Sequence, residues 1–369
     1  MKSVFDYDSN LTLREADASR LVWRSVKERA FGTYGSDALH EEGFCRLTAK
    51  ERDVLRPLND GEAWLAEQSA GIQVRFQTNS SRIFLRVKLN GRFNMTNMTQ
   101  IGQCGADLYV YDEQMGFVLH EVARFAFDGD GYEVSLGHFA GQECKERQYI
   151  LYLPLYIAVK SCEIGLDEDA TLSPFGFSRS CRVAVYGTSI TQGCCASRPG
   201  LAYTNILSRK LDIAVENYGF SGTAFMEREM GTFLGKRAPD VLFVDVEPNA
   251  GVDERLEQNA EGFLDEFLRR SPQTAVVIYS RVLFAMDRYD DYRVRLREHY
   301  ASFLKRTARA YAKKGYRVHF ADGSRVFPDN YTEYTCDGLH PSDAGMFCLA
   351  KSYCKQLMRL KKLYGLDLP

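Results

Sequence analysis

From residue 182 to the C-terminus, short apolar runs alternate with longer segments of helical periodicity. The apolar runs include VAVYG, VLFVDVE and TAVVIYS, which are rich in β-branched residues and too short for typical helices. The longer segments, at 202–211, 226–237, 253–270 and 290–314, carry apolar residues at helical spacing. Strands that alternate with helices predict a parallel sheet covered by helices on both faces, which is the α/β fold class.

The chain before residue 174 has a different pattern. From about residue 71 to residue 166, runs such as IQVRFQT, RIFLRVKL and ADLYVYDE alternate apolar and polar residues between Gly, Asn and Asp turns. This alternation is typical of antiparallel strands, so we expect a β-sandwich of jelly-roll type. A length of 369 residues also suits two domains. We place the boundary in LSPFGFSR, which predicts an N-terminal domain at 1–176 and a catalytic domain at 177–369.

A serine follows the first apolar run of the second domain. In CRVAVYGTSITQG the strand pattern stops at Gly187, and Ser189 lies on the turn. A serine there can expose its hydroxyl beside backbone N–H groups, as acyl transfer requires. By itself, Gly-Thr-Ser is more often a turn that caps the next helix. The segment TCDGLHP favours the catalytic interpretation, because Asp337 and His340 would complete a hydrolytic triad.

The predicted sheet brings these distant segments together. Ligands of open α/β sheets bind at the carboxyl ends of the strands. Ser189 follows the first predicted strand, NYGFSG follows the second and EPN follows the third, while Asp337 and His340 precede the last predicted helix. We therefore expect residues that are far apart in the sequence to meet in one crevice.

Four segments, GTSITQG, NYGFSG, EPN and DGLHP, resemble in this order the sequence blocks of the SGNH (GDSL-like) hydrolases. GADLY, at 105–109, resembles the GxDLY domain that precedes the catalytic domain in one subfamily. The resemblance implies a flavodoxin-like three-layer catalytic domain. The first block reads GTS where GDS is usual, and the third reads EPNA, with Ala250 where an acid is common. Neither departure removes a triad or oxyanion group.

The resemblance also implies roles for individual residues. Ser189 matches the nucleophile, His340 the general base and Asp337 the carboxylate that orients the imidazole. The oxyanion hole would consist of the backbone N–H groups of Ser189 and Gly222 and the side-chain amide of Asn249. The spacing of three between Asp337 and His340 lets the carboxylate reach Nδ1 while Nε2 faces the serine.

These features predict a serine esterase that hydrolyses small acyl esters through an acyl-enzyme. The resemblance favours acetyl esters of carbohydrates, because SGNH enzymes with an N-terminal β-sandwich are often carbohydrate esterases. An acyltransferase would use the same triad with an acceptor alcohol in place of water. A non-catalytic carbohydrate-binding protein would keep the sandwich and lose the triad geometry. Both alternatives stay open, whereas a thioesterase or lipase is less favoured because no segment resembles an apolar lid.

Arg198, Asp107 and Tyr109 are candidates for substrate binding. Arg198 lies in ASRPG just beyond the serine turn, where a guanidinium could reach a substrate hydroxyl or carboxylate. A loop arginine is more often solvated or paired. Asp107 and Tyr109 belong to GADLY, where strand alternation would equally make one of them an ordinary strand residue.

Composition and motifs argue against several other partners. A formal net charge of −2 argues against nucleic-acid binding, which normally leaves a basic footprint. No stretch approaches the ~18 apolar residues of a membrane span, and the N-terminus lacks an apolar signal region, so we expect a cytoplasmic protein without membrane contact. The ten cysteines form no CxxC pair. Cys194 and Cys195 are adjacent, so they cannot readily supply a tetrahedral site, and no histidine lies at ligand spacing from them. We therefore expect no metal or cofactor; a homo-oligomer stays open.

Overall fold

The computed structural model describes residues 2–8, 12–13, 17–36, 39–126, 128–139, 145–251 and 254–369. Cys144, one of the ten cysteines, and residue 253, the expected start of a helix, lie outside these ranges. No helix in the described ranges has the length and apolar character needed to cross a membrane.

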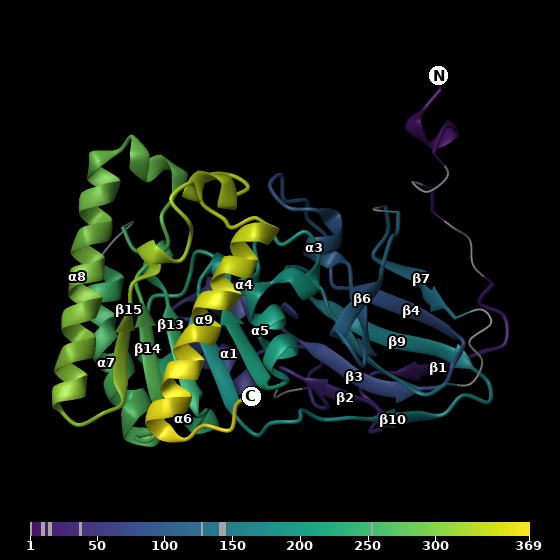
Figure 1. The fold of residues 1–369 in the computed structure, drawn as a ribbon, viewed down its shortest axis with the longest axis horizontal. Helices are drawn as coiled ribbons and strands as arrows, with labels where there is room; N and C mark the ends of the chain where they lie inside the picture. The colour runs from purple at the N-terminus through teal and green to yellow at the C-terminus, as the bar shows by residue number, and fades with distance from the viewer. Residues whose placement is uncertain are drawn as a thin grey trace.

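The N-terminal half forms two antiparallel sheets (Figure 1). The first has the strand order β1–β9–β4–β7, and the second has the order β10–β3–β8–β5–β6, with β2 paired to β3. The strands of the first sheet are β1 (Leu21–Ser25), β4 (Arg82–Leu89), β7 (Gly131–His138) and β9 (Val159–Asp167). The strands of the second are β2 (Gly32–Tyr34), β3 (Gln73–Thr78), β5 (Asp107–Asp112), β6 (Gly116–Val122), β8 (Arg147–Tyr152) and β10 (Leu172–Pro174).

Alternating side chains explain why the two sheets pack face to face. Ile83, Leu85 and Val87 of β4 point to one side and share a buried core with Val74 and Phe76 of β3 in the other sheet. Burial of one face of each sheet removes its apolar surface from water. The predicted antiparallel sandwich is confirmed.

The C-terminal half contains a parallel sheet with the strand order β12–β11–β13–β14–β15. Its strands are β11 (Arg182–Gly187), β12 (Ala214–Gly219), β13 (Val241–Asp245), β14 (Ala275–Tyr279) and β15 (Val318–Ala321), and every neighbouring pair is parallel. Counted from β11, this is the order 2-1-3-4-5 of flavodoxin-like sheets. The predicted α/β class is therefore confirmed.

Helices cover both faces of this sheet, because its strands are apolar on both sides. Val183 and Val185 of β11 lie in one core with residues of α5 (Tyr203–Leu211) and α9 (Asp343–Tyr364), which lie in front of the sheet in Figure 1. Ala184 and Tyr186 lie in the opposite core, with residues of α6 (Arg228–Arg237), α7 (Arg255–Arg270) and α8 (Asp291–Lys313).

Two helices of the N-terminal half join this second core, which the sequence analysis did not anticipate. They are α1 (Ala49–Leu55) and α2 (Asp60–Leu65), and Leu55, Ala63 and Leu65 are buried there. Thr48 caps α1 by accepting a hydrogen bond from the backbone of Glu51, as in a capping box. The two halves are thus joined by packed helices as well as by the short segment 175–181 between β10 and β11.

Candidate active site

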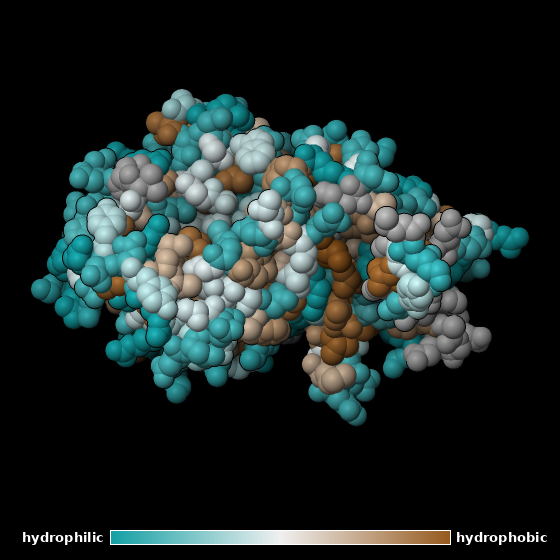
Figure 2. Space-filling model, turned by 90° about the horizontal axis from the view of Figure 1, so that it is seen from above, coloured by the Kyte–Doolittle hydropathy of each residue, from teal (hydrophilic) through white to brown (hydrophobic). Residues whose placement is uncertain are grey.

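Ser189, His340 and Asp337 meet at the carboxyl end of the parallel sheet. Ser189 begins α4 (Ser189–Gln192) directly after β11, and its Oγ lies 2.9 Å from Nε2 of His340. Nδ1 of His340 lies 2.7 Å from Oδ2 of Asp337. Figure 2 looks down on this end of the molecule, where the rim is hydrophilic and hydrophobic residues gather between the two halves. The sequence-predicted triad residues therefore form one hydrogen-bonded chain.

A tight turn holds Asp337 and His340 in register. Oδ1 of Asp337 accepts hydrogen bonds from the backbone N–H groups of Leu339 at 3.0 Å and His340 at 2.8 Å. Gly338 between them has φ +85°, a conformation that favours glycine. Oδ1 thus organises the backbone, which leaves Oδ2 to face the imidazole.

A residue of the N-terminal half also bonds Asp337. Asn97 donates from Nδ2 to Oδ2 of Asp337 at 2.7 Å. Asn97 precedes α3 (Gln100–Cys104), which packs so closely on the loop after Ser189 that a Cβ at Gly102 would lie 2.4 Å from the carbonyl oxygen of Ala196. Sequence reasoning missed Asn97, because the segment around it has neither strand nor helix periodicity.

The surroundings of this chain shift two pKa values in opposite directions. Burial raises the pKa of Asp337, but hydrogen bonds from Asn97 and from the backbone and ring of His340 lower it by more, to far below its usual range. Burial lowers the pKa of His340, but the neighbouring Cys194 and Asp337 outweigh burial and raise the pKa to about 9. Asp337 is consequently an anion beside an imidazole that binds a proton readily.

Gly222 and Asn249 follow the two strands that flank β11. Gly222, after β12, has φ +72°, and among the described residues other than its two chain neighbours no heavy atom lies within 4 Å of the position a Cβ would take. Asn249 ends a 3-10 turn after β13, and its Nδ2 donates to the carbonyl oxygen of Ala224 at 3.1 Å. No other hydrogen bond from this amide is found in the part of the chain that the structure describes. Ser189, at the first position of α4, has an N–H outside the helical hydrogen-bond ladder.

Arg46 of the N-terminal half supports the segment that leads to Gly222. This side chain is 1% exposed and donates to the carbonyl oxygens of Gly219 at 2.5 Å and Leu65 at 2.6 Å. Burial lowers the pKa of Arg46 to about 9. A Cβ at Gly219 would lie 2.1 Å from the backbone nitrogen of Gln192, so glycine is required for this close approach to α4.

Two adjacent thiols lie beside His340. The Sγ atoms of Cys194 and Cys195 are 3.8 Å apart, and these atoms and a ring nitrogen of His340 all lie within 4.8 Å of one another. Both cysteines are buried, and Sγ of Cys195 donates to the carbonyl oxygen of Asn97 at 3.0 Å. Sequence spacing hid this group, because His340 is far from the cysteines along the chain and reaches them only in the fold.

Arg198, Asp107 and Tyr109 contact one another in another place where the two halves meet. Nη1 of Arg198 donates to Oδ2 of Asp107 at 2.6 Å and to the hydroxyl of Tyr109. Both oxygens of Asp107 also accept from the N–H of Gly200, at 2.9 and 3.0 Å, and its side chain is fully buried. We call these four residues the interface cluster. Within the described ranges we find no hydrogen bond between the cluster and Ser189 or His340.

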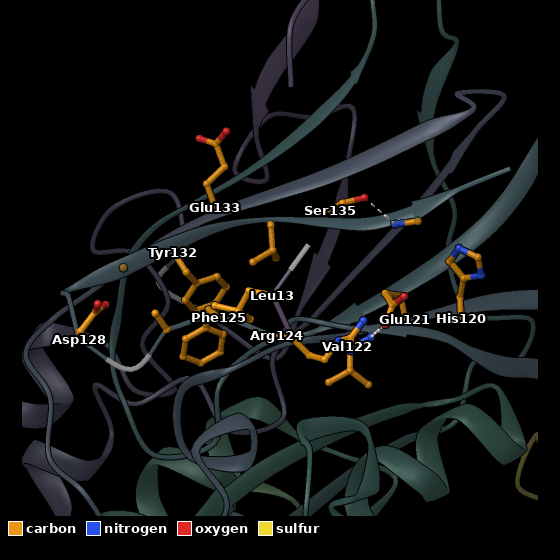
Figure 3. Close-up of a pocket in the computed structure, with 14 residues that line it drawn as sticks. Leu13, His120, Glu121, Val122, Arg124, Phe125, Asp128, Tyr132, Glu133 and Ser135 are labelled. Atoms are coloured by element: carbon orange, nitrogen blue, oxygen red, sulfur yellow. Dashed lines mark hydrogen bonds between the residues drawn. The ribbon is translucent and has the colours of Figure 1, made fainter. Parts of the chain in front are cut away.

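A cavity of about 630 Å³ lies beside β6 and β7 of the sandwich (Figure 3). Its lining includes His120, Glu121, Phe125, Tyr132 and Glu133. None of the residues that the sequence analysis assigned to the site lines it.

Comparison with known proteins identifies the family. Residues 180–358 match the model of the GDSL-like lipase/acylhydrolase family, and residues 21–172 match the GxDLY model, which describes the N-terminus of SGNH hydrolase-type esterases. No curated protein sequence matches the chain.

Three solved structures have the same architecture as this chain. A GDSL-like lipase from Bacteroides ovatus ATCC 8483 is similar at 25% identity and a TM-score of 0.83, over 94% of this chain and 99% of the other. A salicylyl-acyltransferase from a tetracycline biosynthetic pathway is 18% identical with a TM-score of 0.77, over 94% and 98% of the two chains. A family two carbohydrate esterase from Clostridium thermocellum is 14% identical with a TM-score of 0.58, over 80% and 93%. The chain is therefore a serine hydrolase of the GDSL-like lipase/acylhydrolase family with a GxDLY N-terminal domain.

Proposed function

We propose that this enzyme hydrolyses small acyl esters, with acetylated carbohydrate as the leading substrate class, through a triad of Ser189, His340 and Asp337. The observation that carries the proposal is the continuous chain of hydrogen bonds, 2.9 Å from Ser189 to His340 and 2.7 Å from His340 to Asp337. A serine, an imidazole and a carboxylate in this order are the parts of a nucleophile that is activated by an adjacent base.

The reaction proceeds in two steps. Nε2 of His340 removes the proton of Ser189 as Oγ attacks the ester carbonyl, and the imidazolium then gives this proton to the departing alcohol. Water next attacks the acyl-serine, loses a proton to Nε2 and releases the carboxylic acid. The N–H groups of Ser189 and Gly222 and the amide of Asn249 donate to the oxyanion in both steps.

Asn97 and Arg46 act as positioning residues in this mechanism. Asn97 occupies one lone pair of Oδ2 of Asp337 and so fixes the carboxylate against Nδ1 of His340. Arg46 fixes the carbonyl oxygen of Gly219, three residues before the proposed oxyanion donor Gly222. Because both come from the N-terminal half, we infer that the domains at 1–176 and 177–369 work as one unit.

The substrate class rests on two observations. Proteins of the same fold include enzymes named as carbohydrate esterases and one named as an acyltransferase. Trp64 and Phe93 of the N-terminal half are exposed, at 49% and 38%, with ring centroids 6.1 Å apart, and both line a small hollow together with Tyr156. Tyr156 in turn donates to the carbonyl oxygen of Ser189 at 3.5 Å, so aromatic surface suited to a sugar ring lies near the nucleophile.

Release of free acid from p-nitrophenyl esters of increasing chain length, followed by acetylated sugars, tests the proposal. Ser189→Ala is expected to reduce the rate to background with an unchanged circular dichroism spectrum. Ser221→Ala is the matched control: this hydroxyl is a neighbour of Gly222, and its loss is expected to lower the rate only modestly. Retention of more than a trace of activity in Ser189→Ala contradicts the assignment of the nucleophile.

The same assay separates hydrolysis from acyl transfer. For a hydrolase, an added sugar alcohol leaves the yield of free acid unchanged. Formation of a new ester at the expense of free acid would instead identify an acyltransferase that uses the same triad.

A further inference from the structure

Cys194, Cys195 and His340 offer one nitrogen and two sulfur donors at the edge of the proposed active site. The three ligand atoms lie within 4.8 Å of one another. Thiolate and imidazole are the ligands preferred by borderline-soft divalent cations, whereas Mg²⁺ and Ca²⁺ prefer oxygen. The donor set therefore selects a zinc-like ion.

The separation of the two sulfur atoms fits tetrahedral coordination. Zn–S bonds are about 2.3 Å long, so two sulfur ligands of one tetrahedral zinc ion lie about 3.8 Å apart. The Sγ atoms of Cys194 and Cys195 are 3.8 Å apart. Cys195 reaches this position with φ +67°, which turns the chain back so that two consecutive side chains point to the same side.

Nδ1 of His340 already has a carboxylate partner, Asp337, of the kind usually found beside metal-binding histidines. Such a histidine usually donates its other ring N–H to a carboxylate, which fixes the ring and its tautomer. Nδ1 of His340 lies 2.7 Å from Asp337, so Nε2 is the ring nitrogen that faces the thiols and Ser189. Oγ of Ser189, 2.9 Å from Nε2, or a water molecule can supply a fourth ligand.

We propose that Cys194, Cys195 and Nε2 of His340 bind Zn²⁺ and that this binding switches the esterase off. Zinc displaces the two thiol protons and takes the lone pair of Nε2. The same lone pair must accept the proton of Ser189 in catalysis, so the two events exclude each other. The inhibitory part rests on the proposed role of His340, whereas the binding site does not.

Metal binding can be measured without any substrate. The full-length enzyme, kept reduced and free of metal, is titrated with Co²⁺, which gives an intense near-ultraviolet absorption when thiolates bind it. We expect this absorption to saturate at one Co²⁺ per chain and to disappear when Zn²⁺ is added. A wild-type enzyme without this absorption overturns the site, whether or not the enzyme proves to be an esterase.

Inhibition is then measured with p-nitrophenyl acetate at buffered concentrations of free Zn²⁺, each rate relative to the metal-free rate of the same variant. Saturating Zn²⁺ is expected to reduce the rate at least ten-fold, EDTA to restore it, and Mg²⁺ to have no effect. EDTA alone leaves the metal-free enzyme unchanged. Full activity at a Zn²⁺ concentration that displaces all Co²⁺ overturns the switch.

Single substitutions locate the site. Cys195→Ser keeps a hydroxyl that can donate to the carbonyl oxygen of Asn97, and Cys194→Ser tests the other sulfur if the first variant fails to fold. Each variant is expected to lose the near-ultraviolet absorption that Co²⁺ gives when both thiolates bind it. Each should also need at least ten-fold more Zn²⁺ for inhibition. Cys336→Ser is the matched control, because Cys336 is an exposed thiol that lies outside the group, with its Sγ 3.8 Å from the carbonyl oxygen of Cys195. Loss of Zn²⁺ sensitivity in Cys336→Ser, but not in the other two variants, overturns the proposal.

Discussion

Two of the polar contacts between the N-terminal half and the catalytic half differ in character. In the interface cluster, Asp107 is fully buried, and its two oxygens accept hydrogen bonds from Arg198 and from the backbone of Gly200. At the proposed active site, Asn97 donates one hydrogen bond to Asp337, whose side chain is 28% exposed. The first contact pairs a fully buried carboxylate with an arginine whose side chain is 18% exposed, whereas the second fixes one atom of a partly exposed carboxylate.

This difference predicts different consequences for stability and for rate. Removal of one member of a buried ion pair leaves its partner charged without compensation, which is costly to folding. Loss of a hydrogen bond to a partly exposed carboxylate costs little stability, because water can replace the donor. Loss of the Asn97 hydrogen bond does, however, release Oδ2 of Asp337, the atom that orients His340. We therefore expect the interface cluster to act mainly on stability and Asn97 mainly on rate.

The largest effect is expected for Asp337→Asn, which should lower kcat by about 10³–10⁴-fold. An amide cannot hold the Nδ1–H tautomer of His340 as a carboxylate does, so Nε2 no longer faces Ser189 as a base. Steady-state kinetics with p-nitrophenyl acetate measure the loss. Asp107→Asn is the matched control: the same change in the interface cluster should leave kcat of the folded enzyme within a few-fold of wild type. Equal losses of kcat in Asp337→Asn and Asp107→Asn would contradict the expectation that the interface cluster acts mainly on stability.

Asp107→Ala should have the largest effect on stability, about 3–5 kcal/mol, because the guanidinium of Arg198 and the N–H of Gly200 lose their acceptor in a buried place. Denaturant-induced unfolding, followed by fluorescence, gives this value. The variant also tests the predicted role of Asp107 in substrate binding. If the KM for acetylated sugars rises while stability is unchanged, Asp107 binds substrate and the interface cluster belongs to the site.

Asn97→Ala should lower kcat by about ten- to a hundred-fold, since a hydrogen bond to a charged group contributes about 1.5–3 kcal/mol. KM and the unfolding midpoint should change little. Asn97→Asp should lower kcat further, because it places a second negative charge against Asp337. Asn94→Ala, an exposed asparagine of the same loop, is the matched control. A parallel fall of stability and rate in Asn97→Ala would mean that Asn97 only holds the loop in place.

Much of the fold and the meeting of Ser189, Asp337 and His340 could be predicted from the sequence, because each depends on local pattern. Alternation of short apolar runs with amphipathic segments determines a parallel sheet, and the carboxyl-end rule then brings Ser189 and His340 together. Helix α1 also had a local signal that was missed, the Thr48-to-Glu51 capping box.

Asn97 and Arg46 had no such signal. Their contacts join residues 240 and 173 positions apart, and both depend on how the two halves pack. The place of Cys194 and Cys195 beside His340 could be predicted only in part from the sequence. Once Ser189 is expected to meet His340, residues five and six positions after Ser189 can be expected near that site too, although no ligand spacing in the sequence indicates it.

The smallest effect concerns a buried carboxylate at the site that lacks the partners Asp107 has. Glu247 follows β13 and is 1% exposed, and its Oε2 accepts from the backbone N–H of Arg281 at 2.9 Å. No hydrogen bond to its Oε1 is found in the described part of the chain, where Nε of Arg281 lies 3.9 Å away. Burial raises the pKa of Glu247 to about 8, although the Arg281 backbone and side chain oppose it.

The raised pKa of Glu247 predicts the direction in which the free energy of unfolding changes with pH. Because the pKa of Glu247 in the folded protein exceeds the value of about 4.3 expected when unfolded, the folded state holds the proton more tightly. Its contribution to stability is complete below about pH 4.3 and is lost as the pH rises through 8. Between pH 7 and pH 8 the wild type should lose about 1 kcal/mol of unfolding free energy that Glu247→Gln does not lose. Glu113→Gln, at an exposed position, should follow the wild type. Equal pH dependence in wild type and Glu247→Gln would mean that Glu247 is ionised in the folded protein and that Arg281 compensates its charge.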